Sequence, residues 1–451
     1  MTQHRFIRLL SVPALLAALA TAAPATAAPA AARSRPDAAL RALDRAAVPL
    51  RSTGPSGAMH DLRPLGRMIG DARIVGLGEA THSSHEFFTM KHRVFRYLVR
   101  EKGFRTFALE APWSTGQRLD AYVLRGEGDP RQIMREEFQE SYRLWNNREY
   151  LSLIHWMRDY NKDHPGDPVR FMGNDFGYSG PALYDTVTDW PRDHEPELLP
   201  ELTALYRGLR PTTDVETYIK DYLAKPLAER KEMASRTARA RRLLANLRPE
   251  SGAERDRFDW ILQDATAIDR TAEGYAFDFD DPEQRRAAMS YRDRVMAENT
   301  VWWQRKTGDR TLLSAHNAHV AYRTYDPEHY PRMQGDVIRE LVGRDYLSVG
   351  FTFDRGSFNA DGGDGTYRRF TVGPAAPGSN EHTLDRVRHR DYLLDQRTAA
   401  PAARDWLATA RPTLSIGTVY PELSKFDIPL LPSHDVLIHL HRVTAAGLLP
   451  E

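Results

Sequence analysis

The amino-acid sequence predicts an α/β protein, with a mainly parallel β-sheet flanked by helices and a long helical insertion. Short apolar segments with the length of buried strands alternate with longer segments of helical periodicity, as expected for a parallel sheet with helices on both faces. Ionisable residues follow directly after four of these apolar segments. A charge-rich block of helical character, residues 195–306, separates the third apolar segment from the fourth.

The N-terminal residues 1–28 have the features of a secretory signal peptide. A short basic segment precedes the apolar stretch Leu9–Ala20, and alanine-rich sequence with Ala-x-Ala sites follows. We therefore expect cleavage near Ala27 or Ala28 and a secreted, extracellular mature protein. The apolar stretch is too short for a comfortable membrane span, and no other segment approaches the required length, so no membrane span is predicted.

The remaining chain divides into a short N-terminal segment, residues 29–64, and one large domain, residues 65–451. A helix is expected over Ala38–Ala47 in the first of these. With 62 basic and 61 acidic residues, the composition gives no reason to expect a nucleic-acid partner or an anionic membrane. The absence of cysteine excludes disulfides, thiolate catalysis and zinc sites built on cysteine.

The first strand of the large domain, Arg73–Leu77, is followed by a glycine that allows the backbone to turn sharply. Helical periodicity then extends over Glu86–Arg100, with apolar residues on one face. The turn and the start of this helix carry four ionisable side chains: Glu79, His82, His85 and Glu86. Open α/β sheets bind ligands at the carboxyl ends of their strands, so this pattern favours a functional site over a simple helix cap.

The rest of the large domain continues the alternation. Further strands are expected over Phe104–Leu109, Val169–Gly173, Thr311–Ala315, Tyr346–Phe351 and Asp435–Leu440. Helices are expected over Gly116–Arg125, Arg131–Phe138, Arg148–Lys162 and, in the helical block, Leu227–Leu247 and Glu283–Lys306. A glycine- and aspartate-rich turn at Asn359–Gly365, followed by Thr366–Val372, predicts a hairpin at the sheet edge.

The ionisable residues after four predicted strands form a candidate active site. They are Glu79 and His82, Glu110, Asp175, and the pair His316 and His319. The sequence lacks the Gly-x-Ser-x-Gly elbow of serine hydrolases, a complete dinucleotide-binding fingerprint, a Walker sequence for phosphate and the zinc-binding His-Glu-x-x-His helix. The leading hypothesis is therefore a histidine that is held by a carboxylate and activates water for attack on an ester.

Two other interpretations fit the same residue types. A divalent metal ion with an open position for water could be bound by five of them: Glu79, His82, Glu110, His316 and His319. Alternatively, the same side chains could line the pocket of a non-catalytic module that binds a ligand or haem. Spacing along the sequence does not distinguish among the three hypotheses.

Several short motifs stand out along the large domain: Gly78–His82 with Glu86–Phe88, Leu109–Ser114, Gly173–Asp175, Arg292–Asp293 with Met296–Asn299, and Ala315–His319. Together they resemble the motifs of the erythromycin esterase family. These motifs are collinear, and the resemblance extends from about Leu65 to the C-terminus. It implies an esterase that opens a macrolide lactone, which is a cyclic carboxylic ester, by means of activated water and without a metal or cofactor. A role in antibiotic resistance is part of that expectation.

The resemblance also implies the catalytic residues. His82, the histidine of the Gly-Glu-Ala-Thr-His motif, would be the general base, and Glu79 would support it. Glu110 would be the carboxylate that follows the second strand. The later catalytic histidine would be His316 or His319, of which we prefer His316.

Substrate binding is expected from five residues: His85, Lys91, Trp113, Asp175 and Arg292. Lys91 stands where some family members have a functionally important arginine. The expected partner is a small-molecule ester, similar to a macrolide. The sequence does not predict an oligomeric state.

Overall fold

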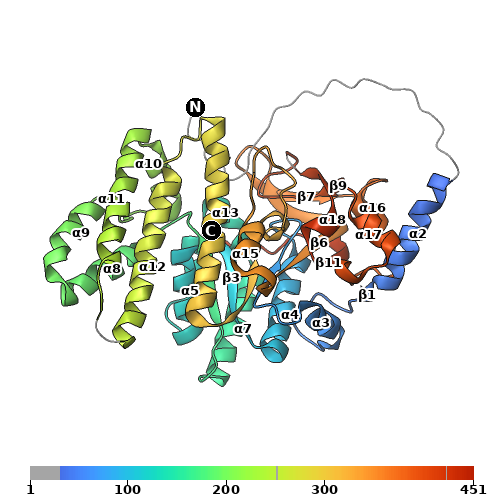
Figure 1. Cartoon of the computed structure of the whole chain (residues 1–451), viewed down its shortest axis with the longest axis horizontal. Helices are drawn as coiled ribbons and strands as arrows, with labels where there is room; N and C mark the ends of the chain where they lie inside the picture. The colour runs from blue at the N-terminus through green and yellow to red at the C-terminus, as the bar shows by residue number, and fades with distance from the viewer. Residues whose placement is uncertain (1–30, 250–251, 423, 451) are drawn as a thin grey trace.

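The computed structural model describes residues 31–249, 252–422 and 424–450 (Figure 1), and the predicted signal peptide lies outside these residues. In the described part of the chain, the main sheet has nine strands in the order β1-β8-β11-β6-β2-β5-β3-β4, with β7 paired to β6. The bounds are β1 Val48–Pro49, β2 Ile74–Leu77, β3 Phe104–Pro112, β4 Arg170–Asp175, β5 Arg310–Ser314, β6 Tyr346–Asp361, β7 Tyr367–Val372, β8 Tyr392–Asp395 and β11 Val436–Val443. Strands β9 Arg411–Leu414 and β10 Lys425–Ile428 form a small separate sheet.

The centre of the main sheet is parallel, which confirms the predicted fold class. From β4 through β3, β5, β2 and β6 to β11 all neighbours are parallel, and β1, β7 and β8 add antiparallel pairs. A hydrophobic core lies on each face of the sheet, and successive residues of a parallel strand alternate between the two cores. Val75 and Leu77 belong to one core, whereas Ile74 belongs to the other. Both faces of the sheet are therefore buried, as the apolar strand sequences predict.

Helices cover both faces of this sheet. The core that contains Val75 includes side chains of α4 (His85–Lys102) and α7 (Arg148–Asp163). The remaining helices outside the insertion are α2 Ala31–Ala46, α3 Arg63–Ile69, α5 Trp113–Arg125, α6 Pro130–Glu137, α14 Asn317–Val320, α15 Gln334–Val342, α16 Asn380–Leu384, α17 Pro401–Leu407 and α18 Leu430–Ser433. Short 3-10 helices are η1 His60–Leu62, η2 Glu140–Trp145, η3 Pro196–Leu198, η4 Gly343–Asp345 and η5 Gln396–Thr398. Within the described residues, we find no helix that is long and apolar enough to span a membrane.

The helical insertion lies between β4 and β5 and begins before the predicted residue 195. Its helices are α8 Pro181–His194, α9 Leu199–Tyr206, α10 Val215–Ala224, α11 Leu227–Ala245, α12 Gly252–Tyr275 and α13 Pro282–Thr307. Figure 1 shows α8 to α12, coloured green to yellow, standing to the left of the sheet. The last helix, α13, contacts both β4 and α15 and so joins the insertion to the sheet.

Some strand boundaries differ from the predicted ones. β3 continues to Pro112, so that Glu110 lies within a strand and not in the following loop. β6 continues to Asp361 because its more polar second half pairs with β11 and β7. The predicted hairpin is confirmed, since Asp361 pairs with Tyr367 across the turn. Strands β1 and β8 were not predicted because they contain only 2 and 4 residues.

Candidate active site

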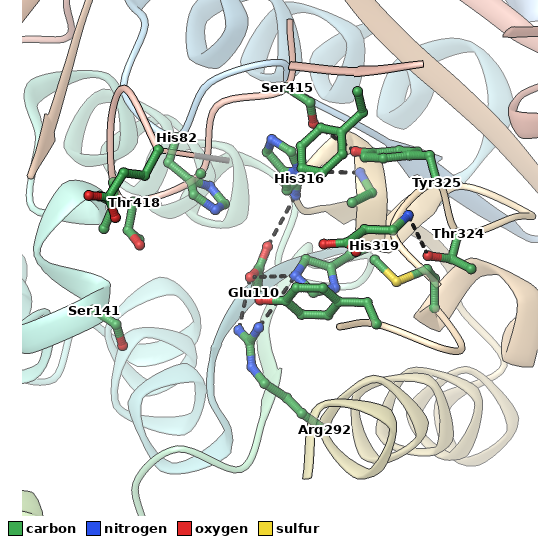
Figure 2. A pocket seen from close by; sticks show the side chains of 18 of the residues that line it. His82, Glu110, Ser141, Arg292, His316, His319, Thr324, Tyr325, Ser415 and Thr418 are labelled. Atoms are coloured by element: carbon green, nitrogen blue, oxygen red, sulfur yellow. Dashed lines mark hydrogen bonds and ion pairs between the residues drawn. The ribbon is translucent and has the colours of Figure 1, made fainter. Parts of the chain in front are cut away.

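A pocket opens at the carboxyl ends of β2, β3 and β5 (Figure 2). Five of the residues predicted from the sequence line it: His82, Glu110, Arg292, His316 and His319. The pocket encloses about 950 Å³ of space that is partly open to solvent. The other lining residues are Ser141, Tyr142, Trp145, Ala318, Thr324, Tyr325, Asp326, Tyr330, Met333, Ser415, Gly417, Thr418, Val419, Glu422 and Phe426.

His82 is held by the buried carboxylate of Glu79. Its Nδ1 lies 2.9 Å from Oε1 of Glu79. A carboxylate acceptor favours the tautomer that carries the proton on Nδ1, which leaves the lone pair on Nε2. The His82 ring packs against Trp145 and His316, with centroid separations of 4.8 and 4.9 Å. The contacts therefore fix the orientation of an imidazole whose free nitrogen can accept a proton.

Lys91 lies behind Glu79 and does not line the pocket. Its buried Nζ forms an ion pair with Oε2 of Glu79. The same ammonium donates to Oγ of Ser314 at 3.0 Å and to the carbonyl oxygen of Ala315 at 3.2 Å. Burial lowers the pKa of Lys91, and the negative charge of Glu79 opposes that shift. Lys91 is thus placed to act on His82 through Glu79, without contact with a bound substrate.

His316 lines the pocket and has a buried ring nitrogen without a hydrogen-bond partner in the described part of the chain. Its Nδ1 accepts a hydrogen bond of 3.2 Å from the backbone N–H of Ala318. In the neutral ring, the proton must then reside on Nε2, which has no hydrogen-bond partner in the described part of the chain. Burial, with the nearby imidazoles of His82 and His319, holds the pKa of His316 well below its ordinary value. His316 is therefore a neutral imidazole with an unsatisfied N–H.

Glu110 is an ionised carboxylate whose two oxygens are both anchored. Nη2 of Arg292 donates to Oε1 at 2.9 Å, and the backbone N–H of His316 donates to Oε2 at 3.1 Å. Burial alone would raise the pKa of Glu110. Attraction to His319 and Arg292, and to His82 when it is protonated, outweighs burial and holds the pKa of Glu110 well below its ordinary value.

Arg292 and His319 are positioned by two further carboxylates. Nη2 of Arg292 donates to Oδ2 of Asp175 at 2.6 Å. Nδ1 of His319 lies 2.7 Å from Oδ1 of Asp293, and its Nε2 lies 3.4 Å from Oε1 of Glu110. Burial lowers the pKa of His319, but Asp293 and Glu110 reverse this effect, and the net shift is upward. Asp293 and Glu110 therefore favour the protonated form of His319, whereas the surroundings of His316 disfavour its protonated form.

Two more of the predicted substrate-binding residues lie outside the pocket. His85 begins α4, with Nδ1 2.6 Å from Oε1 of Glu149, and its side chain is 46% exposed. Trp113 begins α5 and is buried in the hydrophobic core that also contains Ile74, where it packs against Trp302 and Trp303. Asp175 does not line this pocket either, but it holds Arg292 and borders an adjacent cavity.

Other residues of the site were not predicted. Asp293 orients His319 and could have been identified from its place beside Arg292 in the Arg-Asp motif. Tyr142 and Trp145 belong to η2, whose sequence has no catalytic pattern. Their position depends on how η2 folds back toward the end of β4, where the hydroxyl of Tyr142 donates to Asp175 at 2.8 Å.

Trp113→Phe is expected to lower the free energy of unfolding by about 1–3 kcal/mol, because it removes a donor to a buried carboxyl. The indole Nε1 donates to Asp264 at 2.9 Å. Burial raises the pKa of Asp264 to about 7, while hydrogen bonds from Trp113 and Gln117 oppose the rise. Chemical denaturation measures this loss. Unchanged stability together with a large fall in substrate affinity would instead place Trp113 in the binding site.

Glu110 in the pocket and Glu79 behind its wall both have partners from the protein itself. The oxygens of Glu79 contact His82 and Lys91, and those of Glu110 contact Arg292 and the backbone of His316. Within the described ranges, one group of at least three His, Asp or Glu ligand atoms lies close enough to hold a metal ion. It consists of Asp354, Asp385 and His441, none of which lines the pocket.

Comparison with known proteins identifies the chain's relatives. The model of the erythromycin esterase family matches residues 99–443. An erythromycin esterase type II of Escherichia coli is 25% identical over 324 residues, which cover 68% of this chain and 74% of that protein. A putative hydrolase of Bacillus subtilis is 27% identical over 155 residues, covering 34% of this chain and 33% of that protein.

Solved structures share the fold over most of their length. A protein from Bacillus cereus is 29% identical, with a TM-score of 0.83, and the match covers 92% of this chain and 99% of that one. A protein described as a succinoglycan biosynthesis protein matches equally widely, with 29% identity and a TM-score of 0.81. An erythromycin esterase mutant in its open conformation has the same fold at 18% identity, with a TM-score of 0.67 and coverage of 88% and 98%. The chain therefore belongs to the erythromycin esterase family and is a hydrolase.

Proposed function

We propose that this protein hydrolyses a carboxylic ester by direct attack of water, with His82 as the general base. The facing pair of imidazoles in Figure 2 carries the proposal. His82 offers a lone pair, His316 offers an unpartnered N–H, and their ring centroids are 4.9 Å apart. These two groups match the two needs of the reaction, which are removal of a proton from water and stabilisation of the developing oxyanion.

The reaction proceeds in two stages. Nε2 of His82 accepts a proton from water while the water oxygen bonds to the ester carbonyl carbon. The carbonyl oxygen becomes an oxyanion and accepts a hydrogen bond from Nε2 of His316. The bond to the alcohol oxygen then breaks, and the His82 imidazolium returns its proton to the leaving alkoxide. Glu79 stabilises the imidazolium between these stages, and the products are a carboxylic acid and an alcohol.

Glu110 orients the attacking water and stabilises the positive charge on His82. Its negative charge at the pocket is secured by Arg292 and His319, and its pKa lies well below its ordinary value. Arg292 and His319 are consequently positioning residues, which act on the reaction through Glu110. This assignment separates His319 from His316, because the Nε2 of His319 lies beside Arg292 and Glu110.

Lys91→Met is expected to lower kcat by roughly ten- to a hundredfold with little change in KM, because the buried charge of Glu79 loses its cation and His82 loses its fixed position. Lys91→Arg keeps the positive charge and should retain most of the activity. Steady-state kinetics of both variants tests this. A rise in KM with unchanged kcat in Lys91→Met would mean that Lys91 contacts substrate.

The proposed substrate is a macrolide lactone or a related carboxylic ester. It is supported by membership of the erythromycin esterase family and by the relative in Escherichia coli that bears that name. Purified protein should be incubated with erythromycin and, separately, with a panel of simple esters, with and without EDTA. Ring opening of erythromycin that is unaffected by EDTA would support a macrolide esterase without a metal.

Each other outcome of this experiment selects one of the alternatives. Turnover of simple esters alone would keep ester hydrolysis and reject macrolides as substrates. Loss of activity in EDTA, together with bound metal by elemental analysis, would favour a metal-dependent hydrolase. Stoichiometric binding without any turnover would favour a ligand-binding module.

We also propose that the mature protein is secreted. The support is the basic segment, apolar stretch and Ala-x-Ala sites of residues 1–28. N-terminal sequencing of protein from the culture medium should begin near Pro29. Protein that stays inside the cells with an intact N-terminus would contradict secretion.

A further inference from the structure

A second cavity adjoins the active-site pocket. It encloses about 630 Å³ of space, partly open to solvent, between η2, the end of β4 and the helices α10, α12 and α13. Ser141, Tyr142 and Arg292 line both cavities. The proposed reaction does not use this second cavity, which borders the pocket at these three shared residues.

The walls of the second cavity are mainly apolar. Ile219, Phe279, Ala288 and Met289 line it on the side of the helical insertion, and Phe176 lines it on the side of the sheet. Such walls favour an apolar guest, because apolar surface gains free energy when it leaves water.

The two carboxylates that line this cavity already have partners: Glu140 forms an ion pair with Lys220 at 3.3 Å, and Asp175 is bound by several protein groups. Oδ2 of Asp175 accepts hydrogen bonds from the hydroxyl of Tyr142 at 2.8 Å and from Nε of Arg292 at 2.9 Å. Its Oδ1 accepts the backbone N–H of Phe176 at 2.8 Å. Since these contacts satisfy both carboxylate oxygens of Asp175, a bound ligand does not need a positive charge to pair with them. The guest expected here is neutral.

The wall between the cavities is an unusual piece of backbone. Glu140, the first residue of η2, has φ 51°, and it is the single non-glycine residue with positive φ in the described chain. Strained conformations of this kind cluster at functional sites. The strained residue, Glu140, directly precedes Ser141 and Tyr142, which line both cavities. A Cβ on Gly177 would lie 2.2 Å from the Tyr142 hydroxyl, so Gly177 is needed for this close packing.

We propose that the second cavity is a subsite for an apolar arm on the acyl side of the ester substrate. This inference rests on the proposed hydrolysis. His82 must reach the leaving alkoxide to protonate it, which puts the alcohol part beside His82. The acyl part then extends past Glu110 toward Arg292, which also lines the second cavity. The substrate class is therefore an ester whose acyl chain continues into several apolar carbons.

The test compares p-nitrophenyl acetate, butyrate, hexanoate and octanoate as substrates. For the wild-type protein, kcat/KM should rise about two- to fourfold for each methylene that enters the cavity. Ala288→Leu fills the cavity, so the ratio of kcat/KM for hexanoate to that for acetate should fall toward one. The matched control is Ala287→Leu on the same helix, whose side chain is exposed and does not line the cavity. This control should keep the wild-type ratio.

A second variant tests the subsite independently, in case Ala288→Leu does not fold. Met289→Ala enlarges the cavity and should raise kcat/KM for octanoate relative to hexanoate by at least twofold. Equal chain-length profiles for the wild-type protein and all three variants would overturn the subsite.

Binding of a molecule that cannot be hydrolysed tests the subsite independently of the proposed reaction. The ketone 2-octanone has an apolar arm but no bond to hydrolyse, and calorimetry measures its affinity. Weaker binding to Ala288→Leu than to Ala287→Leu would uphold the subsite even if no ester were hydrolysed, and would leave the reaction as the part in error. Equal binding to both variants, with active ester hydrolysis in the wild type, would overturn the subsite alone.

Discussion

Replacing His82 with alanine is expected to lower kcat/KM for ester hydrolysis by roughly a thousand- to ten-thousandfold. The variant loses the nitrogen that removes a proton from water and later returns one to the leaving alkoxide. The fold should persist, because the ring lies at the pocket surface and Glu79 keeps its ion pair with Lys91. Steady-state kinetics and circular dichroism of the same preparation test both parts of the prediction.

A suitable control for His82→Ala is His155→Ala. His155 is an exposed histidine of α7 whose Nδ1 lies 3.1 Å from the hydroxyl of Tyr122. It does not line the pocket, so its removal should leave kcat/KM within twofold of the wild-type value. Nearly full activity of His82→Ala, at unchanged stability, would contradict the assignment of His82 as the base.

His316→Leu is expected to lower kcat by about a hundred- to a thousandfold, which is the usual cost of removing one oxyanion donor. His316→Gln should recover much of that loss, because a glutamine amide can place an N–H near the former position of Nε2. The pKa of His316 lies well below its ordinary value, so the ring remains a neutral donor throughout the neutral pH range. The pH profiles of the wild-type and His316→Gln enzymes should therefore have the same shape.

Two results would count against this role of His316. One is equal activity of His316→Leu and the wild-type enzyme. The other is an acid limb of the pH profile that disappears in His316→Gln, because this would mean that His316 titrates during catalysis. Kinetics over a range of pH with all three proteins distinguishes these outcomes.

The parallel part of the sheet could be predicted from the sequence because its strands are short, apolar and separated by helices. The same reasoning predicted that Glu110, Asp175 and the histidines after β5 would converge, since parallel strands end at one edge. It could not determine which of these side chains reach the pocket and which lie behind its wall. Glu79 and Asp175 lie behind the pocket wall, whereas Glu110 lines the pocket from within β3.

Other features depend on contacts between distant segments, which periodicity does not reveal. Lys91 lies on the buried face of α4, and its ion pair with Glu79 depends on how α4 packs against β3 and β11. Trp113 belongs to a motif with Glu110, but it is the first residue of α5 and packs against Trp302 and Trp303 in a hydrophobic core, away from the pocket. The 3-10 helix η2, with Tyr142 and Trp145, enters the site only through its tertiary position.

The most direct test of the central claim is the mass of the product formed in water enriched in heavy oxygen. Erythromycin, or the best ester from the panel, should be incubated side by side with the wild-type enzyme and His82→Ala. We expect the wild-type product to gain one labelled water, with the label in the new carboxylate, and the substrate to remain unchanged with His82→Ala. Equal amounts of labelled product from both enzymes would contradict His82-activated attack of water.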